Sequence, residues 1–314
     1  MRFSISTRVG AIMALALSAG IGALAAPGPA WAHAVCGDRV FPATLTMDDP
    51  GVGDELSLPT ITYSPIRANN GNPSGHSLDY GAEWDKTITK DLGFALNGDY
   101  FTQRGAGQNL NGWNNITLTL KDELPCWEAH EFMASIGVIR EFAKSGSAEL
   151  VTAGAIDKVS NTTPTLYLGK GLGDLPIGYL RPLALTGEVG FQESDNPNTS
   201  PDQWNYAFSV QYSMPYLDQH VRALGGAAFL AHFVPLVEFV YSAPHNAATT
   251  GTISPGVLYE ADVWQFGVEA MLPANAATSQ TQGVGVIAQF HLFIDDIFPT
   301  TLGKPLIDKD LWEW

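Results

Sequence analysis

The sequence predicts an all-β protein, a transmembrane antiparallel up-and-down β-barrel of about 12 strands. The first observation is a pair of segments, residues 263–272 and 283–294, in which large apolar residues share one parity and small or polar residues share the other. The second is that 45% of residues are hydrophobic and 15% are charged, although no apolar run of helix-spanning length follows the N-terminus. The third is an alternation of long and short polar connections. Together they favour strands with one lipid-facing side.

The N-terminus has the features of a bacterial export signal. Arg2 and Arg8 precede an apolar run over residues 9–26, and small residues follow it. This order of a basic, an apolar and a small-residue region is typical of a signal peptide that is removed after export. We predict a signal peptide over residues 1–34, with cleavage after Ala32 or Ala34.

The first six predicted strands follow from alternation with a period of two. Residues 55–64 alternate less regularly because a proline interrupts them, whereas residues 77–85 set Tyr80 and Trp84 against acidic residues. A short polar turn leads from there to residues 92–100, which predicts a hairpin. The next three predicted strands cover residues 113–121, 130–139 and 164–170.

The second six predicted strands alternate more clearly. Residues 204–214 set large aromatic and apolar residues against small or polar ones over the whole segment. The other five cover residues 182–191, 231–241, 253–260, 263–272 and 283–294. An even number of strands puts both chain ends on the periplasmic side of an outer-membrane barrel. The expected domains are therefore a periplasmic N-terminal linker (35–53), the barrel (54–294) and a periplasmic C-terminal tail (295–314).

The connections between these strands support the same topology. Counted from a periplasmic N-terminus, the odd-numbered connections should be the outer loops, and all of them are polar and long. Most even-numbered connections are shorter. A secreted β-sandwich, the alternative all-β fold, would also alternate but does not predict this order of loop lengths. The expected outer loops are residues 65–76, 101–112, 140–163, 192–203, 242–251 and 273–282.

The two faces of the predicted wall differ in composition. The outward parity carries many large aromatic residues, several of them near strand ends, where aromatic girdles lie at membrane interfaces. The inward parity has more acids than bases, so a water-filled lumen should favour cations or neutral solutes over anions. A plugged lumen is the alternative, since about twelve strands lie between filled small barrels and open porins. The candidate lumen-lining residues are Asp79, Glu83, Asp99, Lys121, Glu188, Gln211, Glu238, Gln265, Glu269, Gln289 and His291.

The two cysteines lie on the same side of the predicted membrane. Cys36 precedes the first strand and Cys126 lies between the fourth and the fifth. An oxidising compartment and an even count make them a disulfide candidate, with two free thiols as the alternative.

The chain lacks the sequence motifs of common enzymes. It contains no G-x-S-x-G, H-E-x-x-H, phosphate-binding loop or C-x-x-C. We therefore predict that it is not an enzyme, with no catalytic residues, no metal site and no cofactor. A barrel-embedded hydrolase that uses His232 or His291 is the alternative, and hydrogen-bonded filling of a narrow lumen is the simpler explanation of both histidines.

The charge of the chain limits its partners. The formal net charge of −16 argues against nucleic acid and against anionic lipid. The expected partners are the lipid of the bacterial outer membrane around the barrel and small solutes inside it. The sequence carries no signal for the oligomeric state.

The last third of the chain also carries a family resemblance. Residues 256–273, 283–299 and 302–306 resemble segments of proteobacterial outer-membrane proteins and are similar to the transporter family labelled for the MetA pathway of phenol degradation. The resemblance implies an outer-membrane barrel that takes up small hydrophobic or aromatic compounds, and it assigns no functional residue. The tail that ends at Trp314 departs from barrels that end on their last strand. The expected function is a passive channel or transporter for small solutes.

Overall fold

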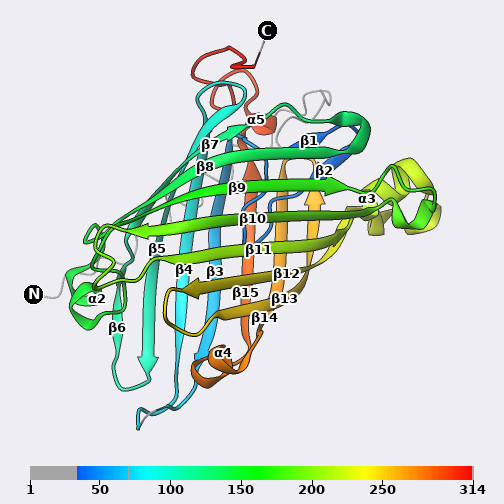
Figure 1. Cartoon of the computed structure of the whole chain (residues 1–314). Coiled ribbons are helices and arrows are strands. Elements are labelled where there is room, and N and C mark those ends of the chain that lie inside the picture. Colours follow the sequence, from blue (N-terminus) through cyan, green and yellow to red (C-terminus); the bar gives the residue numbers. More distant parts are fainter. Residues whose placement is uncertain (1–33, 70, 313–314) are drawn as a thin grey trace, which may run out of the picture. The chain divides into compact units, whose positions relative to one another are not determined.

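The computed structural model describes residues 34–69 and 71–312, and this part of the chain forms a closed β-barrel (Figure 1). The predicted signal peptide lies outside the described residues, except for Ala34. None of the described helices is long and apolar enough to cross a membrane. The strands of the wall are β3 (Glu55–Ile66), β4 (Gly75–Thr87), β5 (Leu92–Gly105), β6 (Leu110–Trp113), β7 (Ile116–Glu123), β8 (Phe132–Phe142), β9 (Asn161–Gly171), β10 (Leu183–Ser194), β11 (Gln203–Tyr212), β12 (Phe233–Pro244), β13 (Thr250–Ala261), β14 (Trp264–Pro273) and β15 (Gly285–Phe293).

Antiparallel pairing of neighbouring strands closes the sheet on itself. β15 pairs with β3, and β4 pairs with both β3 and β5. β6 and β7 both pair with β5 and share one position, so the wall has twelve positions in all. The predicted 12-stranded up-and-down barrel, closed between its first and last strands, is confirmed. All twelve predicted segments overlap wall strands.

The break between β6 and β7 lies at two asparagines, Asn114 and Asn115. Asn115 Nδ2 donates to Glu141 Oε1 over 2.7 Å and to the carbonyl oxygen of Asp157 over 2.9 Å. Asn114 donates through its side chain to Asp99. Asn114 thus stays bonded to β5, where its N–H also donates to the carbonyl oxygen of Asp99 over 2.9 Å, whereas the side chain of Asn115 bonds outside the β5 ladder.

The barrel closes where β15 pairs with β3, and we call this pairing the seam. It contains a register irregularity at Pro59, the proline that interrupts the alternation in the sequence. The register shifts between Ser57 and Thr60 on one side of β3, and between Gln289 and His291 on β15. Leu58 and Pro59 form this bulge. It changes the parity of β3, so that the segments before and after it both keep their apolar residues outward.

The two ends of the barrel carry different connections. We call the end where β3 begins and β15 ends the terminal end, and the opposite one the far end. Figure 1 draws α5 (Ile294–Ile297) at the terminal end and α4 (Ala276–Thr281) at the far end. β5 and β6 extend into the predicted loop over residues 101–112, since a hydrogen-bonded ladder can continue without an apolar pattern. The other described elements are the strands β1 (Ala34–Cys36) and β2 (Arg39–Phe41), the α-helices α2 (Ala148–Ala153), α3 (Met214–Tyr216), α4 (Ala276–Thr281) and α5 (Ile294–Ile297), and the short helices η1 (Glu128–His130), η2 (Gly178–Leu180), η3 (Leu217–Val221) and η4 (Gly225–His232).

The tail after α5 folds back on the terminal end. Leu306 N–H donates to the carbonyl oxygen of Thr87 over 3.2 Å, and Ile307 N–H donates to that of Ile88 over 2.8 Å. Lys86 Nζ donates to the carbonyl oxygen of Lys304 over 2.7 Å. The tail therefore covers the turn between β4 and β5.

The outward face of the wall is apolar and aromatic. Trp204 and Trp113 are more than half exposed in the isolated chain. Aromatic rings also stack between neighbouring strands, for example Phe208 on Phe239 with centroids 4.5 Å apart. A continuous apolar outside of this kind is stable only against lipid or another apolar surface.

Candidate functional site

The chain between β2 and β3, residues 42–54, lies inside the barrel, and we call it the inner segment. Its Thr46 donates from the N–H over 3.0 Å and from the hydroxyl over 2.6 Å to Glu238 Oε2 on β12. Gln265 Nε2 on β14 donates to the carbonyl oxygen of Ala43 over 2.7 Å. Side chains of the β12–β14 wall therefore hold one side of the inner segment.

The opposite side of the inner segment is bound to β7. Lys121 Nζ lies 2.7 Å from Asp48 Oδ2 and donates to the carbonyl oxygen of Asp49 over 3.0 Å. Val52 N–H donates to Glu123 Oε2 over 3.1 Å. The inner segment thus crosses the lumen from one side of the wall to the other.

Glycines in the wall make room for this segment. A Cβ at Gly93 on β5 would lie 2.6 Å from Cγ1 of Val52, and a Cβ at Gly169 on β9 would lie 2.9 Å from Cγ of Pro50. Real Cβ atoms do not approach carbon so closely, so a side chain at either position would displace the segment. The two glycines are therefore sockets for the inner segment.

Leu45 fixes the inner segment by apolar packing. It fits against Gly267 on β14, where any Cβ would overlap its side chain. Around it, β12, β13 and β15 turn apolar residues into the lumen, against the general polarity of that face. Together with Leu45, the buried members of this cluster are Val234, Leu236, Leu258 and Ile287. Burying a leucine in such a pocket contributes about 1.5–3 kcal/mol to holding the segment.

The location of the inner segment differs from the expectation. We predicted residues 35–53 as a periplasmic N-terminal linker, and residues 43–53 line or fill the lumen. The physical reason is the width of the barrel, since wall side chains alone do not fill a lumen of about twelve strands. The polar composition of the segment, which suggested a solvated linker, is matched by Lys121 and Glu238 of the wall.

A cavity of about 540 Å³ remains on the β3–β5 side of the inner segment. Its lining contains eight carboxyl side chains, one lysine (Lys121) and one histidine (His291). The carboxyl groups come from both the wall and the inner segment. They belong to Asp48, Asp49, Glu55, Asp79, Glu83, Asp85, Asp99 and Glu188. The cavity is therefore strongly acidic.

The structure divides the candidate lumen residues into two groups. Asp79, Glu83, Asp99, Lys121, Glu188, Gln289 and His291 line the cavity. Gln211, Glu238, Gln265 and Glu269 are buried away from it. Four of the cavity's carboxyl groups were not among the predicted lumen residues: Asp48, Asp49 and Glu55 lie on or beside the inner segment, and Asp85 lies at the end of β4. The only signal in the sequence was the acidic doublet at residues 48–49.

The two histidines considered for a hydrolase lie apart. His232 is exposed at the terminal end, where Nδ1 is 2.8 Å from the carbonyl oxygen of Glu260. His291 is buried, with Nδ1 2.8 Å from Ser57 Oγ and Nε2 2.7 Å from Glu55 Oε2. Ser57 is only 2% exposed, so this group resembles the hydrogen-bonded interior of a barrel more than an accessible nucleophile.

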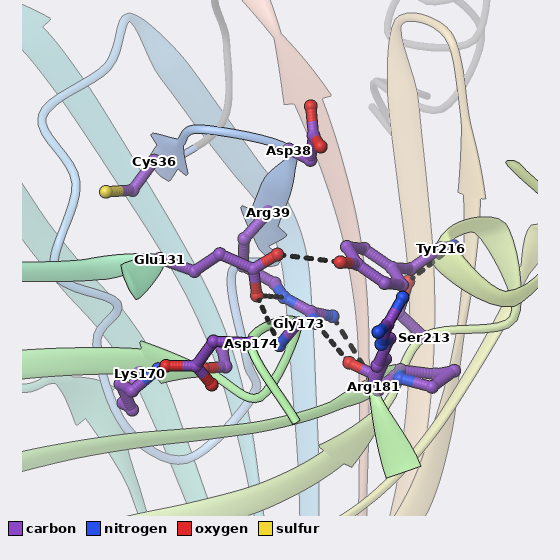
Figure 2. Close-up of polar contacts among 12 residues, drawn as sticks. Cys36, Asp38, Arg39, Glu131, Lys170, Gly173, Asp174, Arg181, Ser213 and Tyr216 are labelled. Atoms are coloured by element: carbon purple, nitrogen blue, oxygen red, sulfur yellow. Dashed lines mark hydrogen bonds and ion pairs between the residues drawn. The ribbon is translucent and has the colours of Figure 1, made fainter. Parts of the chain in front are cut away.

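A second polar cluster fastens β2 to the terminal end (Figure 2). Arg39 is fully buried, and its Nε donates to Glu131 Oε2 over 3.0 Å. Tyr216 donates its hydroxyl to Glu131 Oε1 over 2.8 Å, and its ring lies 3.8 Å from the guanidinium carbon of Arg39. Burial and the hydrogen bond to Glu131 raise the pKa of Tyr216 to about 12. Its hydroxyl therefore stays a donor at neutral pH.

A disulfide lies beside this cluster. Cys36 and Cys126, our disulfide candidate, are bonded with their Cα atoms 5.8 Å apart. The bond ties β1 to the connection between β7 and β8. The inner segment is thus anchored at its N-terminal end by a covalent bond and by the Arg39–Glu131 ion pair.

Protein exported and folded without reductant is expected to yield one peptide pair joined through Cys36 and Cys126 in a non-reducing digest. The Cys126→Ser variant should lose about 2–4 kcal/mol of unfolding free energy, since the bond closes a long loop. Mass spectrometry and denaturant unfolding in detergent would measure both results. Thiol labelling of both cysteines in the unreduced, unfolded protein would contradict the assignment.

These features define a class of protein, the closed antiparallel β-barrel with an apolar outside and a polar, partly filled inside. No protein-family model and no curated protein matches the sequence. Among solved structures, the fold is similar to the COG4313 outer membrane channel from Pseudomonas putida F1, with a TM-score of 0.50 and 12% identity over 81% of this chain and 99% of that one. The KdgM porin is similar with a TM-score of 0.42 and 13% identity, over 74% and 98% of the two chains. At these identities the likeness describes the fold.

Proposed function

We propose that this protein is a passive channel of the bacterial outer membrane that conducts small solutes past the inner segment. One observation carries the proposal: a barrel with an apolar outside encloses a polar cavity lined by eight carboxyl groups and a single lysine. An apolar outer face suits lipid, and a polar interior cavity suits water and dissolved solutes. The likeness of the fold to an outer membrane channel supports the same class of function.

The acidic lining determines which solutes should pass. Fixed carboxylates attract cations and repel anions in a narrow pore. Cations and neutral solutes should therefore enter more readily than anions. The family resemblance implies small aromatic compounds as substrates. These are neutral solutes of a suitable size, so they belong among the solutes to be tested.

Refolded protein in a planar bilayer is expected to conduct potassium chloride with a preference for potassium. Under a salt gradient, the reversal potential should move toward the potassium equilibrium potential, because fixed negative charge excludes chloride. A shift in gel mobility on heating provides the check that the barrel has folded and inserted. A folded, inserted barrel that never conducts would overturn the channel assignment.

A further inference from the structure

The wall of the acidic cavity carries its carboxyl groups at successive depths. On β4, Asp79, Glu83 and Asp85 point inward, with Gly81 between the first two. Alternate residues of a strand are about 7 Å apart along its axis. The carboxyl groups therefore form a ladder along the barrel, and Asp99 on β5 joins it opposite Gly81.

The carboxyl groups of β4 and β5 lack cationic partners within the described residues. The cavity's lysine, Lys121, is paired with Asp48 of the inner segment. Its histidine, His291, contacts Glu55 and Ser57. No lysine, arginine or histidine in the described part of the chain forms an ion pair with the four cavity acids of β4 and β5, Asp79, Glu83, Asp85 and Asp99.

An unused acceptor lies at the same depth as Gly81. Pairing across the seam brings Gln289, Thr60, Gly81 and Asp99 into one row of the wall. Gln289 is 9% exposed, and its Nε2 donates to Thr60 Oγ1 over 3.1 Å. Its Oε1 has no hydrogen-bond partner, although a buried amide oxygen normally has one. The cavity thus combines excess negative charge with an acceptor that needs a donor.

The glycine in this row, Gly81, lines the cavity and has no close contact at its Cβ position. The nearest atoms to a Cβ built at Gly81 would be Thr60 Cβ at 3.5 Å, the carbonyl oxygen of Thr60 at 3.7 Å and Asp99 Cβ at 3.8 Å, which are ordinary contacts. A larger side chain can therefore occupy the space above Gly81 without distorting the wall. The same space is available to a ligand.

We propose that this row is a binding site for linear organic cations that carry more than one ammonium group, a substrate class for the proposed channel on which this inference rests. Ammonium groups supply both positive charge and several N–H donors, which Asp99, the β4 carboxyl groups and Gln289 Oε1 can accept. A spacer of a few carbons puts the charges at successive rungs of the ladder.

A metal ion fits this arrangement less well. In the described residues no three histidine, cysteine, aspartate or glutamate side chains converge closely enough to hold one. Divalent metals require several oxygen ligands around a single point, at about 2.0–2.6 Å. A row of separated carboxyl groups is suited instead to an extended cation. The cavity volume of about 540 Å³ is within the usual range for small organic ligands.

Calorimetry on refolded protein in detergent tests the site with putrescine and magnesium, two probes of equal charge. Putrescine should bind, and an equal concentration of magnesium should not displace it. Asp99→Asn, which keeps an oxygen to accept from Asn114, should weaken putrescine binding about tenfold, because a charge in contact with the ligand is lost. Gly81→Leu should abolish binding by filling the space.

Matched variants separate the site from general electrostatics. Gly98→Leu makes the same change at a glycine of β5 with no atom within 4 Å, and Glu149→Gln removes an exposed charge on α2. Both should bind putrescine like the unchanged protein. Equal binding of magnesium, or unchanged binding in Gly81→Leu, would overturn the proposal.

The same variants in planar bilayers distinguish a failure of the cation site from a failure of the proposed channel function. Putrescine should reduce potassium current through the unchanged channel and have no effect on Gly81→Leu. A protein that conducts potassium but neither binds putrescine nor is blocked by it would overturn the cation site and leave the channel standing. A protein that never conducts would overturn the channel, and with it the role of this class as a transported substrate.

Discussion

Replacement of residues 43–51 by a glycine–serine linker of equal length is expected to raise single-channel conductance severalfold. These residues hold the inner segment across the lumen through Thr46, Asp48 and Leu45. Without those contacts the segment loses its fixed position, and ions gain the full cross-section of a barrel of about twelve strands. Planar-bilayer recordings measure the effect directly.

A point variant tests the same idea without altering the segment itself. In Gly267→Leu the new side chain would occupy the position of Leu45 and displace the inner segment from the wall. Conductance should rise, although less than with the linker. Gly98→Leu is the control, because that glycine has open space around it and its conductance should not change. If the linker variant folds, by heat-shifted gel mobility, and conducts like the unchanged protein, the inner segment does not restrict the pore.

The Arg39→Met variant is expected to lose about 3–5 kcal/mol of unfolding free energy. Arg39 is fully excluded from solvent and neutralises Glu131, which is 6% exposed. Without the guanidinium group, the buried carboxylate keeps two partners among the described residues, the hydroxyl of Tyr216 and the N–H of Gly173. The carbonyl oxygens of Arg181 and Pro182 also lose their donor. Guanidinium unfolding followed by tryptophan fluorescence in detergent measures the loss.

A double variant identifies the source of this cost. Arg39→Met combined with Glu131→Met removes both charges and should be more stable than Arg39→Met alone, because no unpaired charge remains buried. If Arg39→Met costs less than about 1 kcal/mol, the ion pair behaves like a solvated surface pair and does not fasten β2 to the barrel.

The fold could be predicted from the sequence because a lipid-facing wall imposes a strict alternation of apolar residues. Every second residue of strands such as Gln203–Tyr212 must be apolar, and the lumen-facing residues need not be. The same alternation gave the number of strands and the closure of the seam. The ends of the strands were harder to predict. β5 and β6 continue through residues with no apolar pattern, because only backbone hydrogen bonds define the two strands there.

The inner segment could not be predicted, because its partners are far from it in sequence. Thr46 and Glu238 are 192 residues apart, and Gln265 and Ala43 are 222 apart. A polar stretch before the first strand has the same composition whether it lies in solvent or in a polar lumen. Ile287 and Val234 broke the inward polar pattern, and their packing with Leu45 in one buried cluster accounts for their apolar side chains.

The sequence by itself determined which side of each strand meets apolar surroundings and which side carries charge, because alternation with a period of two is a local property of the strand. The tertiary structure alone decided how the charged side is used. It brought Asp48 to Lys121, packed Leu45 against Gly267 and left an acidic cavity beside β4 and β5. These contacts join parts of the chain that come together only when the barrel closes around the inner segment, and no local pattern encodes them.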